Sequence, residues 1–289
     1  MKTDILQFYT RHTRFTDPGE YANHLKALPA GMDALHSALS GLLMPIWKVQ
    51  KHHPELVLAR PEEIKTRHIR RSLEAMLAID DRPLNVARDE SRRLIVDCRH
   101  FAALLCAVLR QRGIPARSRW GFATYLEKTH YQNHCLCEYW SAKEGRWVLE
   151  DPDLQMQDVA PEQFITAGRA WQMCREDRDN GALFGFGRHP RGLGLSNVRG
   201  ILVSDFAALN GFEMLSDDWW GMHLKNNKDV TKDDTAVLDR AAILAITEES
   251  FAERRELYQN CEALRVPPVI ETHAPGSSRH VGIEWRKEA

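Results

Sequence analysis

The sequence has no uninterrupted apolar run of about 18 residues, the length that a membrane-spanning helix requires. Its first five residues, Met1 to Ile5, are not a basic segment followed by an apolar one, so we expect no signal peptide. An excess of charge is also missing, because 39 basic and 40 acidic residues leave a formal net charge of -1. These absences predict no nucleic-acid partner and no membrane partner, and they favour a cytoplasmic location.

Metal-binding and phosphate-binding motifs are missing as well. The six cysteines form no Cys-x-x-Cys pair. The glycine motifs at 185–187 and 192–194 have neither the third glycine nor the lysine-serine ending of a phosphate-binding loop. Cys135, Cys137 and His134 are close in sequence, but on a strand the two cysteines would share one face while His134 points to the other, and no second ligand pair follows. We therefore expect no metal and no cofactor, and we expect reduced cysteines.

Three regions follow from the pattern of apolar residues. Helical spacing predicts a helical N-terminal region over residues 1–80, packed on a core at residues 81–170. Residues 171–289 are predicted to be a loop-rich and helical extension. Within that extension we expect a loop over 180–200, and little order in the tail from residue 272. With 43% hydrophobic residues, the chain can bury a sizeable core.

The clearest helix pattern covers residues 97–112. Asp97 is a suitable N-cap, a wide apolar stripe follows it, and Gly113 ends the pattern. Three strands are predicted after this helix, and the last two are joined by a hairpin loop that ends at Gly145. Their predicted ranges are 116–124, 134–140 and 146–151.

A cysteine, a histidine and an aspartate occupy the ends of these elements. Cys98 begins the helix, His134 opens the second strand and Asp151 closes the third. A thiol needs a base, and the base needs a third group that holds its ring, which is the logic of a nucleophilic triad. The helix start predicts a lowered pKa for Cys98, and its backbone N–H groups could hold an oxyanion.

The register of the hairpin tests this triad. If Trp140 pairs with Gly145, His134 faces Asp151 directly. If Trp140 pairs with Arg146, Asp151 points to the opposite face of the sheet. The triad therefore requires the first register, or a bulge near Gly145.

Three sequence blocks resemble the transglutaminase-like superfamily of the papain-like fold group. Members typically have a cysteine at a helix start, Gly-Ile-Pro-Ala-Arg after that helix, a His-x-x-x-Glu strand and a Trp-Val-x-x-Asp-Pro strand. All these features occur here in the same order. The blocks are Asp97–Ala102 running to Gly113–Arg117, then His134–Glu138, then Trp147–Pro152.

The resemblance implies an α+β papain-like core in which the helix that bears the nucleophile packs on an antiparallel sheet. It implies that Cys98 is the nucleophile, that His134 is the general base and acid, and that Asp151 orients the histidine. It also implies a thioester intermediate formed from a small-molecule or peptide acyl substrate, which is an amide, a peptide or a thioester. The acyl group would then pass to water or to an amine, with no metal.

Two positions depart from the family pattern. Many relatives have an acid where this chain has His100, and a tryptophan where it has Leu136. These departures leave the substrate open, and the second oxyanion donor is open too, with Asn85 and Arg92 as candidates. The alternative interpretation is a binding or scaffold module that keeps the fold without turnover. The complete triad argues against this alternative, while the two departures favour it.

Glu138 and the tryptophans near these blocks have structural interpretations as well. Glu138 could bind substrate, but we interpret it as a structural partner of an arginine such as Arg117. Trp120, Trp140 and Trp147 are interpreted as parts of the core or of a cleft wall.

Overall fold

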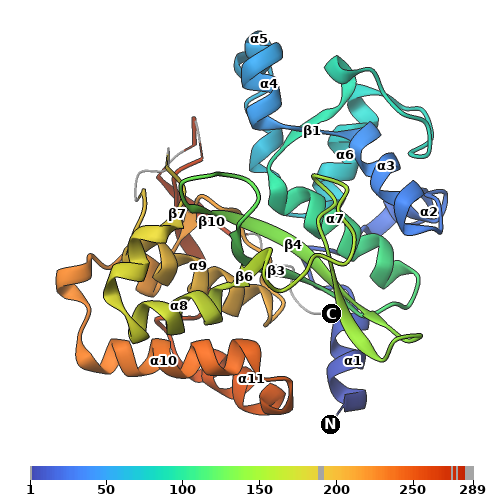
Figure 1. Ribbon diagram of the computed structural model, residues 1–289. Coiled ribbons are helices and arrows are strands. Elements are labelled where there is room, and N and C mark those ends of the chain that lie inside the picture. Colours follow the sequence, from blue (N-terminus) through green and yellow to red (C-terminus); the bar gives the residue numbers. More distant parts are fainter. Residues whose placement is uncertain (1, 188–191, 275, 278, 284–289) are drawn as a thin grey trace.

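The computed structural model describes the chain except for residues 1, 188–191, 275, 278 and 284–289 (Figure 1). Its N-terminal part is a series of short helices, which prolines and glycines interrupt. These are α1 (Lys2–Thr10), α2 (Ala22–Lys26), α3 (Met32–Leu42), α4 (Ile46–His52), α5 (Pro54–Ala59) and α6 (Ile69–Ile79).

A small parallel sheet leads into the predicted nucleophile. Strand β1 (Leu43–Pro45) pairs with β2 (Leu94–Val96), and Pro45 lies opposite Val96. All three residues of β2 are buried, and α7 (Cys98–Gln111) begins two residues after Val96. The prediction of a helix over residues 97–112 is therefore confirmed.

The central sheet contains the predicted His and Asp strands. Its strand order is β5-β4-β3-β6, with β7 pairing parallel to β4 at one end. Neighbouring strands along the main path are antiparallel, as the short β4–β5 hairpin requires. The bounds are β3 (Ala116–Ala123), β4 (Tyr131–Ser141), β5 (Arg146–Glu150), β6 (Phe164–Thr166) and β7 (Phe184–Gly185).

The C-terminal part adds helices and a second small sheet. Its helices are α8 (Ala167–Glu176), α9 (Leu195–Ala208), α10 (Lys232–Ile246) and α11 (Phe251–Asn260). Its antiparallel sheet has the order β10-β9-β8, formed by β8 (Asp218–Trp219), β9 (Val269–Thr272) and β10 (His280–Gly282). Short 3₁₀ turns lie at Gly19–Tyr21, Glu63–Lys65, Glu90–Arg92, Arg178–Leu183, Gly221–His223, Asn227–Asp229 and Glu248–Ser250.

Two expectations for this part are wrong. The predicted loop over 180–200 includes the first turns of α9, which begins at Leu195 after Gly194. The tail after residue 272 includes β10, which pairs with β9 from His280 to Gly282. Tertiary packing explains both, because α9 is almost entirely buried and β10 is held by its partner strand. Residues 188–191, 275, 278 and 284–289 of these segments lie outside the described residues.

Helices cover both faces of the central sheet (Figure 1). Helix α7 packs against β3 and β4 from one face, and α9 packs against β3 from the other. One continuous core of buried apolar residues includes members from the N-terminal helices, the central sheet and the C-terminal helices. The fold is thus α+β, with a helix on an antiparallel sheet as predicted. Among the described residues, no helix is both long and apolar enough to span a bilayer.

Candidate active site

Cys98 is the first residue of α7, and a capping box fixes this helix start. The Asp97 side chain accepts a hydrogen bond from the backbone N–H of His100 at 3.3 Å. The His100 ring in turn accepts a hydrogen bond from the backbone N–H of Asp97. Ser216 from the C-terminal part donates to the other carboxylate oxygen of Asp97 at 3.0 Å. Cys98 is partly exposed as a residue, unlike the four cysteines that are fully buried.

His134 and Asp151 lie in direct contact. His134 is inside β4, which begins at Tyr131 and not at His134 as predicted, and Asp151 directly follows β5. His134 Nε2 is 2.9 Å from Asp151 Oδ2, and both side chains are buried. The Cys98 side chain lies close enough to His134 for each group to shift the pKa of the other. Because Nε2 is bound to Asp151, the nitrogen available to Cys98 is Nδ1. The structure therefore brings the three residues singled out in the sequence close together, with a direct contact between His134 and Asp151.

The β4–β5 hairpin achieves this contact in a register that neither alternative described. Trp140 pairs with Trp147, so the predicted requirement for a Trp140–Gly145 pair, or for a bulge near Gly145, is wrong. The reason is a four-residue loop, closed by Gly145 N–H to Ser141 O at 2.8 Å, in which Gly145 has a φ of 66°. A shift of two residues keeps Asp151 on the same face as His134, one diagonal step away.

Four donors surround the Asp151 carboxylate. The Tyr125 hydroxyl donates to Oδ2 at 2.7 Å, alongside His134. The backbone N–H groups of Asp153 and Leu154 donate to Oδ1 at 3.1 and 3.2 Å. Sequence reasoning missed Tyr125, although the Asp-Pro turn that supplies the two N–H groups is visible in the sequence.

The electrostatics of the triad differ from the sequence expectation in one respect. Burial raises the pKa of the Cys98 thiol, and the opposing hydrogen bond and charge of His134 do not outweigh it, so the predicted lowering is wrong. Burial alone would lower the pKa of His134, but Asp151 and Cys98 raise it well above its usual value. Burial works against ionisation of Asp151 too, yet the charge of His134 brings its pKa below the usual value.

Both proposed second oxyanion donors are exposed side chains. Arg92 is 60% exposed and pairs with Asp80 at 3.7 Å, and Asn85 is exposed. No hydrogen bond or ion pair among the described residues joins either of them to the triad. The α7 start remains the source of backbone N–H groups beside the sulfur.

The two departures from the family pattern have structural roles. His100 is 2% exposed, and its Nδ1 lies 2.6 Å from Asp97 Oδ1, so it belongs to the cap of α7. Leu136 is fully buried in a small apolar cluster with Ala123, Val159 and Phe164. In the part of the chain that the structure describes, no group of three His, Cys, Asp or Glu side chains could hold a metal ion.

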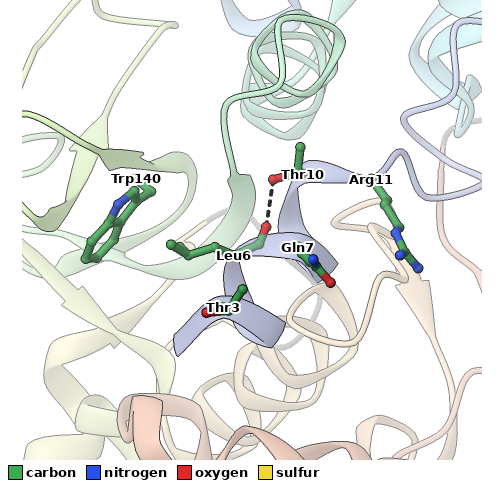
Figure 2. A pocket seen from close by; sticks show the side chains of 6 residues that line it. All are labelled: Thr3, Leu6, Gln7, Thr10, Arg11 and Trp140. Carbon is green, nitrogen blue, oxygen red and sulfur yellow. Dashed lines mark hydrogen bonds between the residues drawn. The ribbon is translucent and has the colours of Figure 1, made fainter. Parts of the chain in front are cut away.

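A cavity of about 610 Å³ lies away from the triad. It is lined by α1 residues and by Trp140, and Figure 2 shows Leu6 pointing toward the Trp140 ring. Trp140 is six residues from His134 on β4, which corresponds to about 20 Å along a strand. This cavity is therefore separate from the candidate site. Trp140 forms part of a cavity wall, as expected, but the cavity is not the one beside the triad.

Comparison with known proteins places the candidate site in a transglutaminase-like region. Residues 66–152 match the transglutaminase-like superfamily, and this range contains Cys98, His134 and Asp151. The chain is also similar to a protein-glutamine gamma-glutamyltransferase of Pseudomonas aeruginosa, with 36% identity over 75 residues. That match covers 23% of this chain and 11% of the relative, so the chain spans only a small part of its length. No solved structure matches the chain significantly.

Proposed function

We propose that this protein is an enzyme that transfers or hydrolyses acyl groups through a cysteine thioester. Its substrate would be an amide, a peptide or a thioester, and the acceptor would be water or an amine. The observation that carries this proposal is the contact between His134 Nε2 and Asp151 Oδ2 at 2.9 Å, next to Cys98, where Cys98 and His134 each shift the pKa of the other. The transglutaminase-like match over residues 66–152 supports the same class of chemistry.

Each residue has a separate role in the proposed reaction. The Cys98 sulfur attacks the carbonyl carbon and its proton passes to His134, while N–H groups at the start of α7 stabilise the oxyanion. His134 then gives that proton to the leaving group as the thioester forms. Water or an amine next attacks the thioester, loses a proton to His134 and releases the thiolate. Asp151 holds the imidazole ring throughout.

The pKa shifts predict that labelling and turnover rise toward alkaline pH. Burial favours the protonated thiol of Cys98, and Asp151 favours the protonated imidazole of His134. The resting pair must therefore lose one proton before it carries a thiolate. Because both pKa values are raised, this loss occurs above the pH at which a free thiol and a free imidazole would lose protons.

The first experiment is alkylation by iodoacetamide from about pH 5 to about pH 9, a range around the usual thiol pKa of about 8.5, with the modified cysteine mapped by mass spectrometry. We expect selective labelling of Cys98, rising with pH and strongly reduced in His134→Ala. Cys261 is the other partly exposed cysteine and serves as the matched control, with Cys261→Ala leaving the profile of Cys98 unchanged.

Turnover on amide and thioester substrates completes the test. Cys98→Ala should abolish it, and Cys261→Ala should leave it intact. Uniform slow labelling of all six cysteines, or turnover that survives Cys98→Ala, would contradict the proposal. The first of these results would favour the alternative of a binding module that keeps the fold without catalysis.

A further inference from the structure

Tyr125 and His134 share one oxygen atom of Asp151. The Tyr125 hydroxyl donates to Oδ2 at 2.7 Å, and His134 Nε2 lies 2.9 Å from the same atom. The Tyr125 ring also meets the His134 ring edge-on, with 6.4 Å between centroids and 87° between planes. Because Oδ1 is occupied by two backbone N–H groups, the carboxylate cannot turn a free oxygen toward His134.

The Tyr125 hydroxyl is a permanent donor. Burial and the charge of Asp151 raise its pKa, so it keeps its proton to a higher pH than an ordinary tyrosine does. Tyr125 follows β3 in the segment that connects it to β4, and the neighbouring Thr124 N–H donates to Gln163 O at 3.0 Å. The backbone beside Tyr125 is thus fixed to the segment before β6, which holds the hydroxyl at Asp151.

We propose that Tyr125 is a positioning residue that limits the basicity of His134 by sharing Asp151 Oδ2. A hydrogen bond from Tyr125 withdraws part of the negative charge that would otherwise stabilise the imidazolium. Without this bond, Asp151 would raise the pKa of His134 still further. This inference rests on the proposed function, in which His134 must both accept and return a proton.

The two halves of the reaction respond to His134 in opposite ways. A more basic His134 takes the Cys98 proton more readily, which increases the fraction of thiolate. The same change leaves His134 protonated at a higher pH, so it is less available to take a proton from the water or amine that attacks the thioester. Tyr125 therefore holds the basicity of His134 between these two requirements.

The variant Tyr125→Phe removes the hydroxyl and keeps the ring. NMR titration of the His134 ring, assigned by comparison with His134→Gln, should show a pKa raised by about one unit. Cys98 should then be alkylated roughly tenfold faster at a pH below the wild-type midpoint. The alkaline rise of turnover should move to higher pH by a similar amount. The matched control is Tyr131→Phe on β4, whose ring packs on Phe184.

Each outcome of this experiment decides a separate point. Slower labelling together with slower turnover, at an unchanged His134 pKa, would mean that Tyr125 only stabilises the fold and would overturn the inference. A His134 pKa that falls in Tyr125→Phe would overturn it too. A raised His134 pKa without selective labelling of Cys98 in any variant would sustain the inference and contradict the proposed function instead.

Discussion

The two faces of the central sheet each bury a glutamate, but the two glutamates have different partners. On the face toward α9, Arg117 and Arg119 both contact Glu138, at 2.6 and 3.1 Å. Arg119 also pairs with Asp205 of α9, and Arg117 pairs with Glu248. Burial would raise the pKa of Glu138, but the two guanidinium groups outweigh it and lower that pKa to about 2. The predicted structural pairing of Glu138 with Arg117 is confirmed.

On the face toward α7, no arginine or lysine among the described residues pairs with Glu150. Glu150 lies opposite Cys137 in the hairpin, and Cys137 meets Cys106 of α7, with 3.3 Å between the sulfurs. His36 Nε2 lies 3.2 Å from Glu150 Oε2. Burial raises the pKa of Glu150 to about 8, and burial lowers that of His36. Two glutamates of one hairpin thus differ because only one of them has arginines beside it.

Removing the carboxylate of Asp205 should cause the largest loss of stability. Asp205 is fully buried and accepts hydrogen bonds from Arg119 and from the backbone N–H of Trp120. Asp205→Ala leaves a buried guanidinium without its main partner, which typically costs about 3–5 kcal/mol. Urea denaturation measures this loss in the free energy of unfolding. Asp158→Asn, which breaks an exposed pair with Arg146, is the control and should leave the urea midpoint unchanged.

Glu150 should give the other face a distinct dependence on pH. The pKa of Glu150 rises from 4.5 to about 8 on folding, so between these values the unfolded chain binds fewer protons than the folded protein. Stability from this group is therefore complete below about pH 4.5 and is lost as the pH rises through 8. Glutamine cannot ionise, so Glu150→Gln should avoid about 2–4 kcal/mol of the unfolding free energy that the wild-type protein loses as the pH rises. Parallel urea midpoints for both proteins across this range would contradict the expectation.

Asp153 should have the smallest effect, because it lies at the end of the sheet. Its Oδ1 atom is buried and has no hydrogen-bond partner in the described structure, and burial raises its pKa to about 6. Its charge raises the pKa of Cys98. Asp153→Asn should therefore shift the alkylation of Cys98 to lower pH by about half a unit. Labelling at fixed intervals of pH measures the shift, and exposed Glu127→Gln controls for net charge.

Local sequence patterns could predict the elements that hold the site. Asp97 and Gly113 delimit α7, and alternation with a glycine-containing loop indicates the β4–β5 hairpin. The partners that decide the charges could not be predicted in this way. Asp205 is 86 residues from Arg119 and Ser216 is 119 residues from Asp97, so only the folded chain brings them together. The raised pKa of Cys98 could not be predicted for a related reason, because it follows from burial, whereas the local sequence pattern indicates only a helix start.

The number of residues in the loop at Ala142–Gly145 determines which face of the sheet Asp151 occupies. Side chains of a strand alternate between faces, so adding or removing one residue in this loop would send Asp151 to the face opposite His134. A change of two residues would return it to the same face. Loss of thiol reactivity in a deletion of Lys143, with partial recovery when Glu144 is deleted too, would show this odd–even rule. A turn about 20 Å from the triad would then govern the site through the number of its residues.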